Sequence, residues 1–237
     1  GVKAIRSLVD RRCDAVLYYN NSFFDHYNIR GDELSDLIDE LPVPLVVMNC
    51  YLPRHPQNCV WFDHSQGARL PVEYLLAQGH KRIAYIAGPL NQRTAQLRLQ
   101  GYQAALATAG IAFDPLLVAE GDRYYHGGYS ACNQLLQRKT EFTALCCFND
   151  LTAIGALKAL EEHGIAVPQQ ISLFGFDNEA VLDYLSPSLS SVQLPAHAFV
   201  THAMTLLLDK LTSTETPKQD DSEFIGELVV RGSVAAL

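Results

Sequence analysis

The sequence of 237 residues lacks any apolar run that approaches the roughly 18 residues needed to span a membrane as a helix. We therefore expect no membrane partner. The sequence is also poor in basic side chains: 18 Lys and Arg stand against 26 Asp and Glu, which gives a formal net charge of -8. Binding to the phosphates of a nucleic acid needs clustered Lys and Arg. Any contact with DNA would thus have to come from a segment that this chain does not contain.

The common catalytic and cofactor motifs are absent as well. The chain has no G-x-S-x-G, no G-x-x-x-x-G-K-[ST], no G-x-G-x-x-G after a strand and no H-E-x-x-H. Its histidines are scattered, and the spacing of His197 and His202 puts them on different faces of a helix instead of together on one metal ion. We therefore predict that the chain is not an enzyme and holds neither a metal nor a cofactor.

Cysteines are present, but their pattern is not that of a disulfide framework or a zinc site. Most lie inside or beside apolar runs, as buried free thiols do. They are Cys13, Cys50, Cys59, Cys132, Cys146 and Cys147. The adjacent pair Cys146 and Cys147 should point to opposite faces of a strand, so it is neither a redox C-x-x-C nor half a zinc site. Free thiols of this kind fit a reducing cytoplasm.

Short apolar runs alternate with amphipathic stretches, which is typical of an α/β fold with a parallel sheet covered by helices on both faces. The first part of the chain predicts helices at residues 2–11, 32–41 and 65–79, and strands at residues 15–19, 45–48 and 60–62. Ser65 is the expected N-cap of the third helix. Because an interior proline costs about 3 kcal/mol, this helix either begins near Pro71 or kinks there, and both alternatives remain open.

After Gly79 the alternation gives a complete doubly wound unit. The predicted strands are residues 83–87, 116–119, 144–148 and 172–176, and the predicted helices are residues 94–109, 128–137 and 152–163. A long helix from residue 196 to about 211, a polar loop at 212–222 and a strand at 227–231 follow.

Polar residues placed directly after strands point to a ligand, because open α/β sheets bind ligands beyond the carboxyl ends of their strands. Asn149 and Asp150 follow one predicted strand, Asp177 follows the next, and Arg98 lies early in the helix after residues 83–87. Carboxylate, guanidinium and amide groups together suit the hydroxyls of a neutral polyol.

A purely structural role competes at each of these positions. Asp150 is well placed to cap the helix at 152–163, which leaves Asn149 as the better ligand contact. For Asp177 a structural turn and a ligand contact are equally favoured, and for Arg98 an exposed helix position is the commoner outcome. Two aromatic positions near the same edge, Phe62 and the Tyr124-Tyr125 pair, are either ligand-stacking or core residues.

The sequence resembles the LacI/GalR family of transcriptional regulators over most of its length. The segments that carry the resemblance are Phe62-Asp63-His64, residues 79–89, Arg98-Leu99-Gln100-Gly101-Tyr102, Phe148-Asn149-Asp150, Gly175-Phe176-Asp177, residues 187–192 and residues 228–233. Their order and spacing match the family throughout. Three positions depart from it: the loop aromatic position corresponds to Arg123 with Tyr124 beside it, Asn178 replaces a second aspartate, and Pro71 interrupts a helix.

The resemblance implies two periplasmic-binding-protein-like halves, each doubly wound, joined by three crossovers and closing on a small-molecule effector. The crossovers are expected near residues 62–65, 192–196 and 220–223. The N-terminal subdomain would comprise residues 1–62 and 194–220, and the C-terminal subdomain residues 63–192 and 222–237. Transferred position by position, the ligand-binding residues are Asn49, Phe62, Arg98, Tyr124, Asn149 and Asp177.

The resemblance also implies partners. A regulator of this family would bind operator DNA through a helix-turn-helix headpiece that is not in this chain, act as a cytoplasmic homodimer, and respond to a sugar, for which we expect a hexose or hexoside; a purine-like effector remains an alternative. The family's first strand-helix-strand unit is missing too, so we expect an unpaired groove in the sheet of the first half. A periplasmic sugar-binding protein of a transport system is the alternative function, and an upstream helix-turn-helix or signal peptide would distinguish the two.

Overall fold

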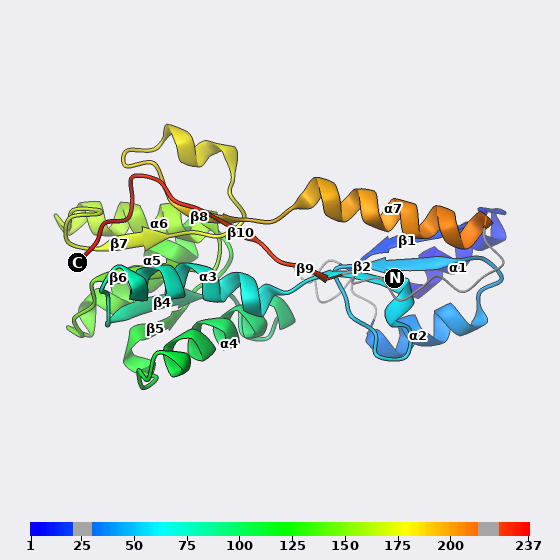
Figure 1. The fold of residues 1–237 in the computed structure, drawn as a ribbon, viewed down its shortest axis with the longest axis horizontal. Coiled ribbons are helices and arrows are strands. Elements are labelled where there is room, and N and C mark those ends of the chain that lie inside the picture. Colours follow the sequence, from blue (N-terminus) through cyan, green and yellow to red (C-terminus); the bar gives the residue numbers. More distant parts are fainter. Residues whose placement is uncertain (21–29, 213–222) are drawn as a thin grey trace. The chain divides into compact units, whose positions relative to one another are not determined.

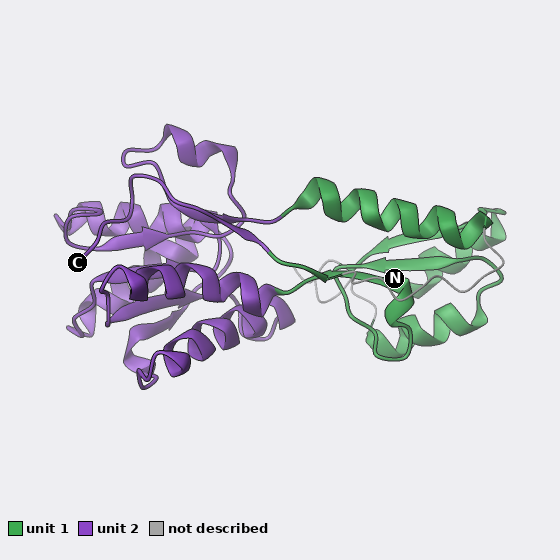
Figure 2. Ribbon diagram, in the orientation of Figure 1, with its two compact units in different colours: residues 1–63, 195–225 green, residues 64–194, 226–237 purple. Residues whose placement is uncertain are grey.

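The computed structural model describes residues 1–20, 30–212 and 223–237. It divides the chain into two compact units (Figure 2): unit 1 comprises Gly1–Asp63 and Pro195–Ile225, and unit 2 comprises His64–Leu194 and Gly226–Leu237. The chain therefore passes from one unit to the other after Asp63, after Leu194 and after Ile225. The polar loop expected at 212–222, which includes most of the expected third crossover, falls almost entirely outside the described residues.

Unit 1 is built on a parallel sheet with the strand order β1-β2-β3-β9 (Figure 1). Its strands are β1 (Val16–Tyr19), β2 (Leu45–Met48), β3 (Cys59–Phe62) and β9 (Glu223–Phe224). Its helices are α1 (Val2–Asp10), α2 (Gly31–Glu40) and α7 (Ala196–Thr212), with a 3-10 turn, η1, at Pro56–Asn58. The apolar stripes of α1 and α2 pack on one face of the sheet, and α7 contacts β1, β2 and β3.

The expected groove within this sheet is not found. The strands β1 and β2 pair directly, with Val16 opposite Leu45, and β2 pairs with β3 in turn. Because the described strands are consecutive neighbours, the sheet has no internal gap, and β1 is an edge strand. The expectation of an unpaired groove was therefore wrong for the described part of unit 1.

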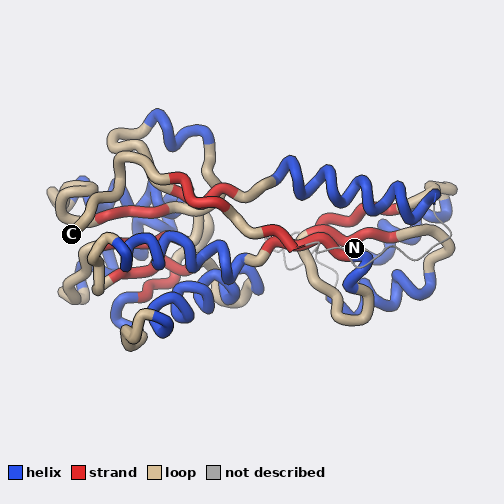
Figure 3. Tube along the Cα trace, in the orientation of Figure 1, coloured by secondary structure: helices blue, strands red, loops and turns tan. Residues whose placement is uncertain are grey.

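Unit 2 contains a second parallel sheet, in the order β5-β4-β6-β7. Figure 3 draws its strands in red and the surrounding helices in blue. The strands are β4 (Ile83–Ala87), β5 (Val118–Glu120), β6 (Ala144–Cys147) and β7 (Ser172–Phe174). The helices α3 (His64–Ala77) and α4 (Arg93–Thr108) share one core cluster with the sheet, and α5 (Tyr125–Gln137) and α6 (Asp150–Glu162) share the other. Short 3-10 helices, η2 (Pro115–Leu117) and η3 (Ala180–Tyr184), complete the unit.

Beside β7, an antiparallel pair carries the chain back across unit 2. It consists of β8 (Ser191–Gln193) and β10 (Glu227–Val229). Single bridges also join Phe174 to Ser190 and Asp177 to Gln193 in parallel. The segment that leaves unit 2 after Leu194 is thereby anchored on the end of β7.

The adjacent cysteines behave as predicted. Cys146 belongs to the core cluster on the α3 and α4 side of the sheet, and Cys147 to the cluster on the α5 and α6 side. All six cysteines are free. The alternation of a β-strand thus places neighbouring thiols on opposite faces of the sheet, where they pack as small apolar groups.

The bounds of the helix that follows β3 exclude a helix start near Pro71, one of the two alternatives left open, and show that Ser65 is not the N-cap. The helix runs continuously from His64 through Pro71 to Ala77, so Pro71 neither starts it nor divides it. Ser65 is the second residue of this helix and therefore not its N-cap. Among the described residues, no helix is both long enough and apolar enough to cross a membrane.

Candidate functional site

Arg98 occupies the inner face of α4, at the end where the parallel strands of unit 2 terminate. Its side chain is only 2% exposed. The exposed helix position, which is the commoner outcome for such a residue, is therefore not adopted here. The guanidinium Nη1 donates to the carbonyl oxygen of Phe148 at 2.5 Å, and Nη2 donates to Oδ1 of Asp177 at 3.1 Å. A buried cation is tolerated only with such partners, because its desolvation costs several kcal/mol.

Two aromatic rings complete the surroundings of the guanidinium. Its Cζ lies 3.6 Å from the ring centroid of Phe176 and 4.8 Å from that of Phe148. Stacking on aromatic faces holds the planar guanidinium in one orientation. The result is a fixed positive group whose position is set by three different segments: α4, the end of β6 and the end of β7.

Asp177 meets Arg98 from the turn after β7. Its carboxylate is partly buried, with 30% of the side chain exposed, so it can reach a ligand while paired. Burial raises the pKa of Asp177, and the nearby Arg98 acts in the opposite direction. The backbone is unusual here, since Asp177 and Asn178 have φ of 109° and 57°, in the left-handed region that few side chains favour.

Asn149 takes the capping role that its neighbour Asp150 was expected to take. It is the N-cap of α6: its Oδ1 accepts from the backbone N–H of Thr152 at 3.0 Å, and the Thr152 hydroxyl completes a capping box. Its Nδ2 donates to the carbonyl oxygen of Arg123 at 3.0 Å. The prediction that Asp150 caps this helix was therefore wrong by one residue.

Asp150, the first residue of α6, is instead buried, with 1% exposure. Its carboxylate accepts from the hydroxyl of Ser191 at 2.6 Å and from the backbone N–H of Glu179 at 2.7 Å. Burial is the main reason that the pKa of Asp150 is raised to about 7, with the charge of Asp177 adding to the effect. The sequence pattern pointed to Asp150 only as a helix cap and gave no sign of these hydrogen bonds, because its partners are 29 and 41 positions away in the chain.

The aromatic candidate Tyr124 lies in the loop that Asn149 contacts. Its side chain is 52% exposed and it precedes α5, with its backbone N–H bonded to Oδ1 of Asp122 at 2.7 Å. The guanidinium of Arg123 is 5.8 Å from the Tyr124 ring. Hydrogen bonding between Asn149 and Arg123 thus brings this loop to the same end of the unit 2 sheet as Arg98.

The remaining two candidates belong to unit 1. Asn49 directly follows β2 with φ of 59° and donates from Nδ2 to the carbonyl oxygen of Asn20 at 3.1 Å. Phe62 ends β3, is 8% exposed, and stacks on Phe199 of α7 with the ring centroids 4.0 Å apart. Phe62 is therefore largely buried in unit 1 at the end of β3, and Asn49 lies at the carboxyl end of the neighbouring strand β2.

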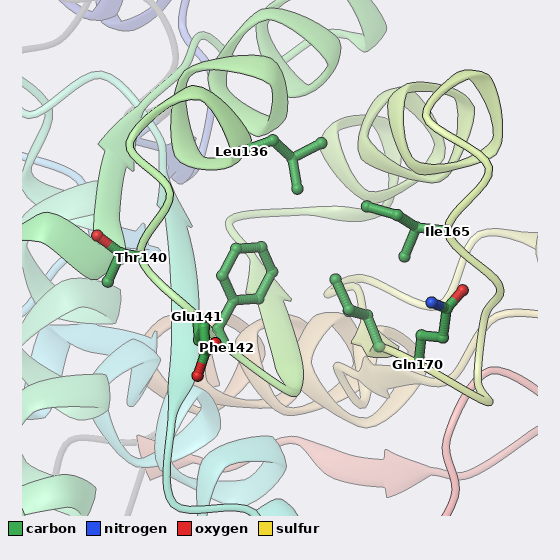
Figure 4. A pocket seen from close by; sticks show the side chains of 7 residues that line it. Leu136, Thr140, Glu141, Phe142, Ile165 and Gln170 are labelled. Atoms are coloured by element: carbon green, nitrogen blue, oxygen red, sulfur yellow. The ribbon is translucent and has the colours of Figure 1, made fainter.

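The described hollow of unit 2 is at the other end of its sheet. It measures about 290 Å³, and Leu136, Phe142 and Ile165 converge on it (Figure 4). Its lining residues Phe142 and Ile171 precede β6 and β7, whereas ligands of open α/β sheets bind beyond the carboxyl ends of the strands. Since the polar side chains gather at the carboxyl ends, we place the candidate site there. The described residues contain no cluster of His, Cys, Asp or Glu that could hold a metal ion.

Comparison with known proteins adds an independent line of observation. Residues 72–234 match the model of a periplasmic binding protein-like domain. The chain is 37% identical over 236 residues to the HTH-type transcriptional regulator AscG of Escherichia coli (strain K12), which covers 99% of this chain and 67% of AscG. It is 36% identical over 233 residues to the HTH-type transcriptional regulator GalR of the same strain, covering 98% of this chain and 66% of GalR. It thus spans about two thirds of these relatives.

Solved structures agree with this family. A sugar-binding transcriptional regulator of the LacI family from Escherichia coli, complexed with phosphate, matches all of this chain and 82% of its own, with a TM-score of 0.92 and 36% identity. The complex of the transcriptional regulator CelR with cellobiose matches 98% of this chain and 70% of its own, with a TM-score of 0.79 and 31% identity.

Proposed function

Because the chain belongs to the LacI/GalR family of transcriptional regulators, we propose that it is the part of such a regulator that binds a sugar effector. The observation that carries the proposal is the pairing of Arg98 with Asp177 at the carboxyl ends of β6 and β7, with Asn149 at the adjoining end of α6. A guanidinium fork, a carboxylate and an amide offer both donors and acceptors to the hydroxyls of a sugar.

Each residue has a distinct role in this proposal. Asp177 accepts hydrogen bonds from effector hydroxyls, and Arg98 donates to them while holding Asp177 in place. Asn149 adds a contact from the end of α6, and Tyr124 stacks on an apolar face of the sugar. Asn49 and Phe62 contribute contacts from unit 1. A hexose or a hexoside is the effector class that we propose, since one relative of known structure was solved with cellobiose.

The wider role is part of the same proposal. The effector changes the affinity of a dimeric, cytoplasmic regulator for operator DNA, which is bound by a headpiece outside this chain. Transport of a sugar in the periplasm is the second candidate. The regulators at 37% and 36% identity favour transcriptional regulation, and sequencing the gene upstream of Gly1 separates the two.

Calorimetry tests the proposal directly. We would titrate the protein with D-galactose, methyl β-D-glucoside and cellobiose, with hypoxanthine as the purine alternative. A hydrogen bond to a charged group contributes about 1.5–3 kcal/mol, so Asp177→Ala should weaken sugar binding roughly tenfold or more. Asp183→Ala is the matched control, because Asp183 is an exposed carboxylate paired with Arg231. Unchanged affinity in Asp177→Ala would refute the assignment.

A further inference from the structure

The carboxylate of Asp150 ties together two segments that are far apart in the sequence. One oxygen accepts from the hydroxyl of Ser191 in β8, and the other accepts from the backbone N–H of Glu179 in the turn after β7. The backbone N–H of Asp150 in turn donates to the carbonyl oxygen of Phe176 at 2.8 Å. The start of α6 is thereby bonded to both ends of the turn that carries Asp177.

Ser191 extends this network to the next residue of the turn. Its Oγ accepts from the backbone N–H of Asn178 at 3.1 Å while it donates to Asp150. The backbone N–H of Asp177 donates to the carbonyl oxygen of Val192 at 2.8 Å. The N–H groups of Asp177, Asn178 and Glu179 are therefore all directed at β8 or at the carboxylate bound to β8.

This turn needs such support because of its backbone. Asp177 and Asn178 are consecutive non-glycine residues with positive φ, and each such residue costs on the order of 1–3 kcal/mol. Gly175 shows how closely the carboxylate packs, since a Cβ there would lie 2.1 Å from Oδ1 of Asp150. The absence of a side chain at Gly175 leaves the space that the Asp150 carboxylate fills.

The same strand leads out of unit 2. Ser191 and Val192 lie in β8, and the chain enters unit 1 after Leu194. A shift of the turn that moves the N–H groups of Asp177 and Asn178 therefore acts on β8 at Val192 and Ser191, two and three residues before Leu194.

We propose that Asp150 is a positioning residue that, through Ser191, holds the Asp177 turn on strand β8 and so links the carboxylate facing Arg98 to the segment that joins the two units. The inference rests on the proposed effector site, because it explains how contact at Asp177 reaches the rest of the chain. Capping of α6 does not explain the hydrogen bonds of the Asp150 carboxylate, since Asn149 caps this helix.

The charged and titratable groups around Asp150 are few. The turn contributes Asp177 and Glu179, α4 contributes Arg98 through its pair with Asp177, and β6 contributes the buried thiol of Cys147. Residues 191–193 of β8 carry no ionisable side chain. Since the pKa of Asp150 is about 7, its protonation can be followed near neutral pH.

Nuclear magnetic resonance of the backbone amides tests the inference without any sugar. In the wild-type protein, the Glu179 amide proton should titrate with a midpoint near neutral pH, because it is bonded to the Asp150 carboxylate. In Asp150→Asn this titration should vanish, and the amides of Asn178 and Glu179 should exchange with deuterium about tenfold faster. The amides of β4 should exchange as before. Asp183→Asn, in the adjacent η3, is the matched control and should behave as the wild type.

A second variant keeps the test decisive should Asp150→Asn fail to fold. Ser191→Ala leaves the carboxylate in place and removes the hydroxyl whose hydrogen bond lowers the pKa of Asp150. The Glu179 titration should therefore move to higher pH, and the Asn178 amide should exchange faster. A Glu179 midpoint and an Asn178 exchange rate that are both left unchanged by Ser191→Ala would overturn the inference.

Sugar titrations on the same samples separate this inference from the proposed function. If D-galactose, methyl β-D-glucoside and cellobiose all fail to bind while the Glu179 titration is present, the proposed effector class fails and the positioning role of Asp150 stands. The other outcome is that a sugar binds the wild type and binds Asp177→Ala more weakly, but leaves the amide resonances of Asn178, Glu179 and Ser191 in the wild type unshifted. The proposed site then stands and the link to β8 fails.

Discussion

At the scale of single residues, Arg98 and Asp177 depend on each other. The guanidinium is fully enclosed and Asp177 is its only ionised partner among the contacts described, while the pKa of Asp177 is already raised by burial. Removing one partner of a buried pair is more harmful than replacing both, because the remaining charge stays desolvated. The pair therefore contributes to the fold of unit 2 as well as to the proposed contact with a sugar.

We predict that Arg98→Met destabilises the protein by about 2–3 kcal/mol. The value is at the lower end for a buried pair because 30% of the Asp177 side chain is exposed to solvent. The pKa of Asp177 should rise further at the same time, since Arg98 is the group that lowers it. Urea unfolding at neutral pH measures the loss. Arg93→Met is the control, because Arg93 is exposed on the same helix, and an equal loss there would contradict the prediction.

The raised pKa of Asp150 gives a pH dependence of known sign. In the folded protein the carboxyl keeps its proton up to about pH 7, whereas in the unfolded chain it loses the proton near its ordinary pKa of 3.8. Its contribution to stability is therefore complete below about pH 4 and is lost as the pH rises through 7. Relative to Asp150→Asn, the wild-type free energy of unfolding should fall by up to about 1.4 kcal/mol per pH unit in this range.

Urea unfolding of both proteins at several pH values between about 5 and 8 measures this difference. Asp177 also has a raised pKa, but it is present in both proteins, so its direct contribution largely cancels in the comparison. A difference in unfolding free energy that stays constant with pH would show that Asp150 does not titrate as the structure indicates.

The residues of the candidate site were predictable to different degrees. Arg98, Asn149 and Asp177 were found from the rule that ligands bind beyond the carboxyl ends of strands, and the structure brings them to one end of the unit 2 sheet. The capping residue was misassigned because α6 begins at Asp150, two residues before the predicted start. The signal was present, since Asn149 is followed three residues later by Thr152, which completes the capping box. The bond from Asp150 to Ser191 joins distant segments, and no local pattern encodes it.

At the scale of elements, unit 2 depends on a close approach of α5 and α6. A Cβ on Gly155 of α6 would lie 2.0 Å from the carbonyl oxygen of Tyr125, and one on Gly128 of α5 would lie 2.1 Å from that of Thr152. The two glycines thus let the backbones of the helices meet near their N-terminal ends. These ends carry Tyr124 and Asn149, so the helix contact also sets the spacing of two candidate site residues.

We predict that Gly155→Ala destabilises the protein by about 1–3 kcal/mol or more, because the helices must separate to admit the methyl group. An alanine in an exposed helix position would instead stabilise by about 1 kcal/mol, so the sign of the effect is informative. Thermal unfolding followed by circular dichroism measures it. Glu161→Ala, at an exposed position of α6, serves as the control, and a stabilised Gly155→Ala would show that the helices are less close than described.

Some strands have the bounds that the sequence pattern predicts, and other elements do not. The strands β2 and β4 have the predicted bounds, since the continuous apolar runs between Pro44 and Asn49 and between Arg82 and Gly88 leave little choice. Pro71 was harder to predict. Its cost inside a helix left two alternatives open, a helix start near Pro71 or a kink there. The structure excludes the start, since α3 runs from His64 through Pro71, where the burial of Pro71, Val72 and Leu75 offsets the lost hydrogen bond. Local propensity is overridden wherever an element is held by a core of this kind.

At the scale of the whole molecule, each unit has its own sheet and its own core. The strands of unit 1 pair only with one another, as do those of unit 2, among the residues that the structure describes. A sequence pattern can indicate two such sheets, but it does not determine which later segment returns to which unit. That assignment came from the family resemblance, because α7 and β9 join unit 1 after the chain has completed most of unit 2.

The proposed effector contacts predict a change in the arrangement of the two units. Asn49 and Phe62 belong to unit 1, and Arg98, Asn149 and Asp177 belong to unit 2. A ligand shifts a conformational equilibrium only by its difference in affinity between the states. A sugar that contacts both sets of residues binds best where both are within reach, so saturating sugar should favour that arrangement and lower the radius of gyration.

Small-angle X-ray scattering with and without the sugar found by calorimetry measures this change. Asp177→Ala is the matched control. At a sugar concentration that saturates only the wild type, the scattering of the variant should stay that of the free protein. At a concentration high enough to saturate the variant, its scattering should approach that of the bound wild type. The radius of gyration responds to the distance between the units and hardly at all to local changes at the site. If calorimetry shows saturation and the scattering curve is unchanged, the sugar contacts one unit alone. Asn49 and Phe62 would then not be effector contacts, and any control of DNA binding would have to start within unit 2.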